Sequence, residues 1–419
     1  MINKQSSCDV LKNSVTFSMS LGAKELFHSN FLYWISLTNR DYFLDIMRDL
    51  AGHSNVHFWW EKSNFEVKRE YHNFDLCICV KYENNSKKAN REDYILMPVL
   101  ILENKMKSLP QTDQLKQYTQ KALDLNKKAR NKLAIDEKTE NGIDQANITF
   151  ILLSLLGSDI DTKFPLDNKD YFWNKKNYQD LYKAFNTSKD ERLEGLTLNI
   201  LNDYMKFIQS LYSLANDWDF NINDSFNQKL IFPDKDLEEL RIHDIRDKIH
   251  FQLLLKLIRE ELEKKYSNLK NIYTNTGYTH QKGLIDVWWK YGDVNFKIQL
   301  QGNVYKHAIE VINNKNQNLD KYCKNEINDE IINSFLNFTK GSEIFKNVVE
   351  EENGSIKIMP KNNRQAVNKG YSDKYCYYGK IFAYRYITIS SCENISIGDV
   401  VKMIVNDVNE YYKKVTMNS

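Results

Sequence analysis

Three residues of this chain have the types and the spacing that metal-assisted hydrolysis requires. Glu103 directly follows the apolar run Met97–Leu102, where a carboxylate is unfavourable unless it is paired or bound to a metal ion. Lys105 stands two residues further on, so its ammonium points to the same face of a strand. Asp75 begins a separate apolar alternation and can supply a second carboxylate from a neighbouring strand. Hard divalent cations prefer such oxygen ligands, and an adjacent ammonium can orient water or stabilise charge on a phosphate. The set predicts phosphodiester hydrolysis; the alternative for each residue alone is an ordinary charge at a strand end.

Apolar periodicity predicts the elements that must hold these residues in place. A strand buried on both faces should carry Glu103, and one of two antiparallel strands should carry Asp75. In chain order we expect a helix over 23–50, two strands within 65–82, a strand over 95–102, a helix over 111–133 and a strand over 148–156. This order is typical of an α/β layer arrangement.

The remainder of the chain predicts two further parts. Residues 159–233 read as mainly helical, with helices near 178–185 and 196–214, and a second α/β unit follows with a helix over 244–265, strands over 283–290, 294–301 and 380–389, and a closing helix over 397–412. We therefore predict a domain over 1–160, a mainly helical connector over 161–235 and a C-terminal α/β or α+β domain over 236–419. Asp286 and Gln299 fall where Asp75 and Glu103 stand in the first half, so one interpretation of the last domain is a degenerate echo of the first.

The composition is that of a folded, soluble protein, with 42% hydrophobic and 27% charged residues. No apolar stretch reaches the roughly 18–20 residues that cross a bilayer, and the first residues lack the apolar block of a signal peptide. We therefore expect a cytoplasmic protein with no membrane contact. Six cysteines without a CxxC pair fit neither a disulfide framework nor a zinc cluster. No GxxxxGK[ST] or GxSxG motif is present, which argues against ATP hydrolysis and serine hydrolase chemistry.

A local positive patch follows the candidate site. The net charge of the chain is only +2, but residues 105–138 carry nine bases against four acids. Such a patch can follow a nucleic-acid backbone through phosphate contacts, and the alternative is an ordinary solvated helix face. The lysines predicted to contact nucleic acid are Lys107, Lys116, Lys121, Lys127 and Lys128.

Together these motifs resemble the PD-(D/E)XK nuclease superfamily. Asp75, the segment LILENK with Glu103 and Lys105, and Gln114 and Tyr118 in QLKQY match its pattern, although Phe74 replaces the usual proline before Asp75. The resemblance implies a restriction-endonuclease-like mixed sheet flanked by helices. It also implies that Gln114 orients the lysine or a substrate phosphate and that Tyr118 braces the backbone, because positions i and i+4 share a helix face.

The segment KELFHSNFLYWI is similar to the opening helix of a bacterial branch of this superfamily. By that resemblance Glu25 completes the metal shell, and His28 and Ser29 lie close to it. The implied cofactor is one or two Mg²⁺ or Mn²⁺ ions held by Glu25, Asp75, Glu103 and the carbonyl group of Asn104, with Lys105 positioning the attacking water.

The resemblance implies a metal-dependent nuclease that hydrolyses DNA, in anti-phage defence or DNA repair. One alternative is a catalytically silent nucleic-acid sensor or assembly subunit of the same fold. Another is a pure interaction protein that binds through its aromatic-rich middle and C-terminal parts. The C-terminal half is where we expect contacts with a second copy or a partner protein.

Overall fold

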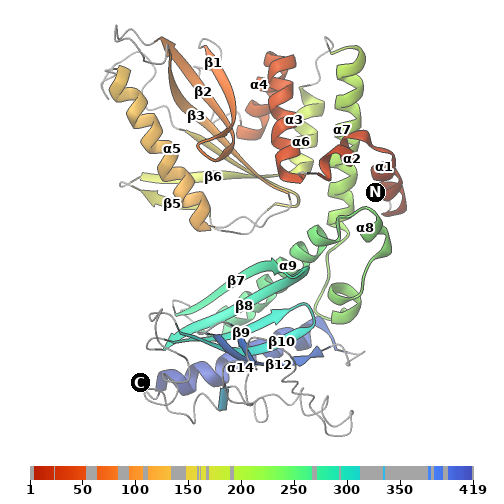
Figure 1. Ribbon diagram of the computed structural model, residues 1–419, viewed down its shortest axis with the longest axis vertical. Coiled ribbons are helices and arrows are strands. Elements are labelled where there is room, and N and C mark those ends of the chain that lie inside the picture. Colours follow the sequence, from red (N-terminus) through yellow and green to blue (C-terminus); the bar gives the residue numbers. More distant parts are fainter. Residues whose placement is uncertain are drawn as a thin grey trace. The chain divides into compact units, whose positions relative to one another are not determined.

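The computed structural model describes residues 4–22, 24–52, 64–83, 94–106, 112–133, 148–157, 160, 162–166, 169–188, 193–266, 271–291, 294–311, 334–335, 376–378, 382–389 and 395–417. The chain divides into two compact units (Figure 1). Unit 1 comprises Met1–Asp217 with Glu239–Arg241, and unit 2 comprises Trp218–Glu238 with Ile242–Ser419. The domain boundaries predicted at 160 and 235 stay a prediction.

Unit 1 is built on a mixed six-stranded sheet in the order β1-β2-β3-β4-β6-β5. Its strands are β1 (Phe65–Tyr71), β2 (Phe74–Glu83), β3 (Tyr94–Lys105), β4 (Thr149–Ser154), β5 (Lys163–Leu166) and β6 (Lys169–Asn177). The first three pair in antiparallel fashion, whereas β3–β4 and β4–β6 are parallel. Because β3, β4 and β6 run in parallel, their carboxyl ends lie at the same end of the sheet, where the candidate residues of β3 also lie.

Helices cover both faces of this sheet (Figure 1). On one face lies α5 (Thr112–Leu133), whose Leu115 and Ala122 pack against Ile101 and Phe150. On the other lie α3 (Lys24–Thr38), α4 (Arg40–Ala51) and α6 (Tyr178–Thr187). Three more helices complete the unit's helical layer: α1 (Lys4–Asn13) and α2 (Val15–Ser20) pack on α7 (Gly195–Asn216). The predicted α/β class is thereby confirmed.

Two local predictions for unit 1 were wrong. The helix expected over 23–50 is broken at Asn39, because its side chain accepts the backbone N–H of Tyr42 at 3.0 Å and starts a new helix there. The connector expected to be mainly helical contains β5 and β6, which belong to the sheet. Trp173 and Phe164 bury their side chains in the core on the α5 side, whereas most other positions of β5 and β6 are polar and Phe172 is exposed, so the sequence shows no clear alternation.

Pro98 lies inside the central strand β3, where proline is normally excluded because it cannot donate a ladder hydrogen bond. The β2–β3 register shifts at this point, from Ile78 opposite Leu100 to Cys79 opposite Pro98. The carbonyl of Pro98 accepts the side-chain N–H of Asn126 from α5 at 2.9 Å. A β-bulge thus accommodates the proline and lets the strand continue to Glu103.

Unit 2 contains a six-stranded sheet in the order β11-β12-β10-β9-β8-β7, antiparallel throughout. Its strands are β7 (Ile272–Thr279), β8 (Lys282–Tyr291), β9 (Val294–Gln301), β10 (Val304–Val311), β11 (Cys376–Tyr378) and β12 (Phe382–Thr388). One face packs on α9 (His243–Lys265) and α14 (Ile397–Met417), with Val287 and Trp289 in the shared core. A π-helical turn, η3 (Asn227–Ile231), and α8 (Lys235–Glu239) precede α9. The helices and strands predicted here are confirmed, and β7, β10 and β11 were not anticipated.

The suggested similarity of unit 2 to unit 1 has support at one pair of residues. Asp286 and Gln299 are register partners on β8 and β9, and the amide of Gln299 donates to the carboxylate at 2.8 Å. The described strands of unit 2 nevertheless pair only in antiparallel fashion, whereas unit 1 contains two parallel pairs. Within the residues described, no helix combines the length and apolarity needed to span a membrane.

Candidate active site

Asp75 and Glu103 come together across the β2–β3 pair. A two-residue turn at His72 and Asn73, both with positive φ, reverses the chain from β1 into β2 and places Asp75 second in that strand. The register then runs through Leu76 opposite Leu102, so Asp75 stands opposite Glu103. The Oδ2 atom of Asp75 accepts the backbone N–H of Asn104 at 2.7 Å.

Glu103 and Lys105 form a buried ion pair on the face that α5 covers. Their Nζ and Oε1 atoms are 2.7 Å apart, with side chains 10% and 2% exposed for lysine and glutamate respectively. The other carboxylate oxygen of Glu103, Oε2, has no hydrogen-bond partner among the described residues. Burial and then the charge of Asp75 raise the pKa of Glu103 to about 7, while Lys105 opposes the shift. A buried carboxylate oxygen without a partner, beside a second carboxylate, fits a divalent cation.

Asn104 faces the other way, as strand alternation requires. Its side-chain oxygen accepts the hydroxyl of Tyr178, at the start of α6, at 3.0 Å. The side chain of Asn104 therefore anchors β3 to the helical layer on the far side of the sheet. Its backbone N–H already binds Asp75, and its carbonyl remains the predicted metal ligand.

Gln114 and Tyr118 lie at the same site, on α5. The amide of Gln114 donates to the hydroxyl of Tyr118 at 2.9 Å, and the ring of Tyr118 meets Phe74 edge-on with centroids 5.6 Å apart. Burial, and then the charge of Glu103, raises the pKa of Tyr118. The structure therefore brings together six of the predicted site residues: Asp75, Glu103, Asn104, Lys105, Gln114 and Tyr118.

Residues 16–206 match the PD-(D/E)XK nuclease superfamily. The match spans the whole sheet of unit 1 with α2, α3, α4, α5 and α6, and it confirms the resemblance for this part of the chain. No curated protein and no solved structure gives a significant match to the chain. The PD-(D/E)XK segment thus includes β5, β6 and α6, which the sequence-based boundary at 160 left out.

Superfamily members typically use divalent metal ions. Among the described residues of this chain, no group of three or more His, Cys, Asp and Glu side chains could hold one. The carboxylates of Asp75 and Glu103 would therefore need further oxygen ligands. The predicted ones are the carbonyl of Asn104 and the carboxylate of Glu25, which lies on α3 but whose side chain is outside the described part of the chain.

His28 lies next to the candidate site, on α3. It is fully buried, with Nδ1 2.9 Å from the hydroxyl of Tyr204 and Nε2 2.9 Å from the sulfur of Met106, the residue after Lys105. Burial lowers the pKa of His28 to about 3, so the ring is neutral. These contacts fix α3 against α7 and the end of β3, which gives His28 a positioning role.

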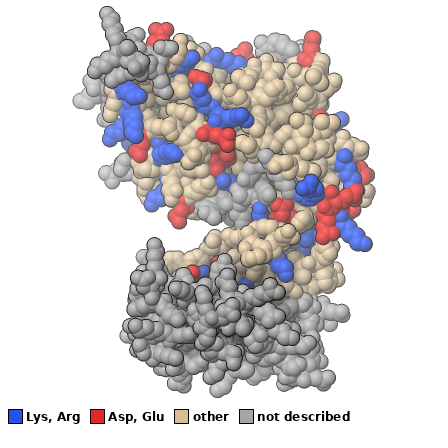
Figure 2. All heavy atoms as spheres, viewed as in Figure 1, with Lys and Arg blue, Asp and Glu red and all other residues tan. Residues whose placement is uncertain are grey.

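Four of the lysines predicted to contact nucleic acid lie on α5, where Figure 2 shows basic side chains gathered. Lys116, Lys127 and Lys128 are exposed and Lys121 is partly buried. Lys107 lies outside the described residues. Burial, and then the charges of Lys121 and Lys128, lower the pKa of His72. These two lysines therefore also lie near the β1–β2 turn.

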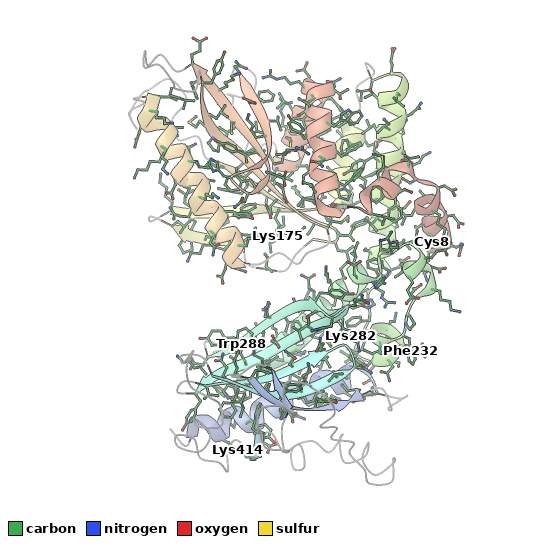
Figure 3. All side chains as sticks on the ribbon, in the orientation of Figure 1. Cys8, Lys175, Phe232, Lys282, Trp288 and Lys414 are labelled. Carbon is green, nitrogen blue, oxygen red and sulfur yellow. The ribbon has the colours of Figure 1, made fainter. Side chains whose placement is uncertain are left out.

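Lys175 is a further candidate, which the sequence did not reveal because β6 was read as helical. Glu103 pairs with Leu152, and Leu152 pairs with Lys175, so the three lie in one row across the sheet. Lys175 shares its strand face with Trp173, whose indole N–H donates to Thr119 of α5 at 2.9 Å. Two strand spacings separate Lys175 from Glu103, roughly 10 Å. The side chain of Lys175, labelled in Figure 3, is exposed and is a candidate for contact with a substrate phosphate.

Proposed function

We propose that unit 1 is a metal-dependent nuclease that hydrolyses phosphodiester bonds, with DNA as the substrate. The observation that carries the proposal is the buried Glu103, whose Oε2 has no partner among the described residues and which lies between Asp75 and Lys105. A purely structural ion pair would satisfy both carboxylate oxygens, because an unpaired buried oxygen costs about 1–3 kcal/mol. A metal-binding carboxylate must keep an oxygen available.

Each residue has a defined part in the proposed reaction. A bound Mg²⁺ or Mn²⁺ supplies Lewis acidity and a water of lowered pKa. Asp75 and Glu103 hold it, with Asn104 and Glu25 as the remaining predicted protein ligands. Lys105 exchanges its contact with Glu103 for the attacking water or a phosphate oxygen, and so positions the nucleophile and offsets developing negative charge.

Residues outside the metal shell hold the substrate and the lysine in place. The hydrogen-bonded Gln114 and Tyr118 fix the side of the site formed by α5. The five lysines named for nucleic-acid contact extend from there along the substrate backbone, and Lys175 contacts it beyond β4. Such contacts weaken as salt concentration rises, because they act through released counterions.

The biological setting follows from the resemblance alone. Stand-alone bacterial members of the superfamily often act in anti-phage defence or DNA repair, so we propose one of these roles for a cytoplasmic enzyme. Contacts with a second copy or a partner protein are proposed for residues 236–419. The competing function is a silent nucleic-acid-binding subunit, and the complete set of Asp75, Glu103 and Lys105 favours the enzyme.

The deciding experiment is a cleavage assay with the full chain on circular and linear DNA, with Mg²⁺ and with EDTA. Glu103→Gln keeps the shape of the side chain and removes its charge, and Glu66→Ala, on the exposed edge strand β1, is the matched control. We expect EDTA-sensitive cleavage by the wild type and by Glu66→Ala, and none by Glu103→Gln. Cutting by Glu103→Gln at the wild-type rate would refute the site, and binding without cutting by the wild type would favour the silent subunit.

A further inference from the structure

In the part of unit 2 that the structure describes, helices pack on one face of the sheet and none packs on the other. Along β8, Ile285, Val287 and Trp289 enter the core with α9 and α14, so the alternate residues point to the opposite side. No helix among the described residues contributes to a core on that side. We call it the aromatic–lysine face, after the six residues that define it: Tyr273, Trp288, Lys297, Lys306, Phe382 and Tyr384.

Aromatic rings and ammonium groups lie next to one another on this face. Tyr273 and Trp288 stack with centroids 5.6 Å apart and planes inclined by 23°. The ammonium of Lys297 lies 5.8 Å from the ring of Trp288 and 5.7 Å from that of Phe382. That of Lys306 lies 5.5 Å from the ring of Tyr384, which in turn is 5.8 Å from the ring of Phe382.

The register places several of these residues in one row across the sheet. Tyr273 is the partner of Trp288, and Trp288 is the partner of Lys297. Lys297 faces Ala308, which pairs with Tyr384, so one row crosses the strands from β7 to β12. With strands about 4.8 Å apart, this row spans roughly 19 Å from Tyr273 to Tyr384, which is long enough to contact several nucleotides.

The lysines and carboxylates of the aromatic–lysine face contact one another and two glutamine side chains. Lys306 donates to the side-chain oxygens of Gln299 at 2.8 Å and Gln301 at 2.6 Å. Asp286 accepts from Gln299, and Glu310 pairs with Lys297 at 3.0 Å. Lys282 lies on the same strand face as Trp288, and Figure 3 labels both on β8. Among the described residues outside the Lys297–Glu310 pair, the face therefore carries the ammonium groups of Lys306 and Lys282 against the one carboxylate of Asp286, a positive surplus that suits an anion.

We propose that the aromatic–lysine face binds single-stranded nucleic acid, with unpaired bases stacked on the rings and phosphates against the lysines. Stacking on a side chain requires a base that is not already stacked within a duplex, so the rings select single strands. A sheet face that only contacts water has no need of aromatic rings. Here Tyr273 is 48% exposed on the edge strand, and Trp288 beside it extends the aromatic surface toward the middle of the sheet. This site is separate from the proposed nuclease centre and does not depend on cleavage.

The test uses the full-length Glu103→Gln protein with EDTA, so that no substrate is cut. Fluorescence anisotropy measures its binding to a 12-nucleotide single-stranded DNA, to an RNA of the same sequence, and to the matching DNA duplex. We expect tighter binding of a single strand than of the duplex. Tyr273→Ala and Trp288→Leu should each weaken single-strand binding about tenfold, since a stacked base contributes about one to two factors of ten. Lys306→Gln should lower the salt dependence of binding by about one counterion.

Two further sets of variants make the result decisive. Phe232→Ala removes another exposed ring of unit 2, 45% exposed and outside the face, and should bind as the parent does. Lys116→Ala with Lys127→Ala tests whether α5 of unit 1 carries the binding instead. Unchanged binding by Tyr273→Ala, whose edge position keeps the core intact, would overturn the proposal, as would loss of single-strand binding only in the α5 variants. Neither outcome alters the cleavage assay, so the two proposals fail separately.

Discussion

Lys105 donates to one oxygen of the Glu103 carboxylate at 2.7 Å, while the other oxygen has no hydrogen-bond partner among the described residues. Both side chains are nearly excluded from solvent, so the cost of desolvating the two charges opposes the Coulomb attraction between them. The position of the Lys105 ammonium therefore depends on what the Glu103 carboxylate binds.

Replacing Lys105 should abolish most cleavage. Lys105→Ala removes the ammonium that would orient water or stabilise charge on phosphate, and the loss of one such group lowers rates about 10²–10³-fold. Single-turnover cleavage at saturating Mg²⁺ measures the effect. Lys68→Ala, which replaces a partly exposed lysine on β1 that pairs with Glu66, is the control. A rate for Lys105→Ala within tenfold of wild type would remove the lysine from the reaction.

Metal affinity should rise with pH up to about 7. Glu103 has its pKa raised to about 7 by burial and the charge of Asp75, so in the metal-free protein it holds a proton that a bound cation must displace. Calorimetric titration with Mg²⁺ at pH 5.5, 6.5 and 7.5, in buffers of different ionisation enthalpy, should show affinity increasing and a proton released at the lower pH values. Affinity independent of pH over this range would contradict the assignment.

The same group predicts how stability without metal depends on pH. The folded pKa lies above the unfolded value, so the contribution of Glu103 is fully present below about pH 4.5 and is lost as pH rises through about 7. Thermal unfolding of unit 1 should therefore show this slope in the wild type with EDTA. Glu103→Gln has no such group, and in it the slope should be reduced.

The Gln114–Tyr118 pair should affect activity more than stability. Tyr118→Phe removes the hydroxyl that accepts from Gln114 and lies beside Glu103, and loss of such a supporting contact lowers activity or metal affinity about 10–100-fold. Cleavage rates and melting temperatures measured together separate the two effects. Gln117→Ala, exposed on the same helix, should change neither. Equal activities of Tyr118→Phe and Gln117→Ala would show that the pair is only structural.

Tyr178 should matter to stability first. Tyr178→Phe leaves the side-chain oxygen of Asn104 without this donor, and the free energy of unfolding should fall by about 1 kcal/mol. Cleavage should fall less than tenfold, because the backbone of Asn104 still binds Asp75. Urea unfolding measures the first effect, with Tyr182→Phe on the same helix as control. A stability loss equal to that of the control would show that the hydrogen bond contributes little.

Lys175 should affect substrate binding. Lys175→Ala should weaken DNA binding several-fold and reduce its salt dependence by about one counterion, with little change in the single-turnover rate at saturating DNA. Lys169→Ala, at the opposite end of β6, is the matched control. Should the two variants bind DNA equally well, the substrate would not reach β6.

The sequence by itself determined which residues form the core of the candidate site. Glu103 and Lys105 are two positions apart at the end of an apolar strand, and that spacing fixes a common face. Gln114 and Tyr118 are one helical turn apart, and the structure joins them by a hydrogen bond. Local periodicity was sufficient for these pairs because each depends only on the geometry of one strand or one helix.

Only the tertiary structure decided which distant residues complete the site. Asn39 split the first helix through a side-chain cap, and β6 joined the sheet because its buried Trp173 packs against Phe150 and α5. Lys175 reaches the row of Glu103 only through the parallel pairing of β4 with both neighbours. The aromatic–lysine face likewise combines strands from Ile272 to Thr388. Pairing between segments far apart in the chain depends on the packing of the whole unit, and no local pattern of residues specifies it.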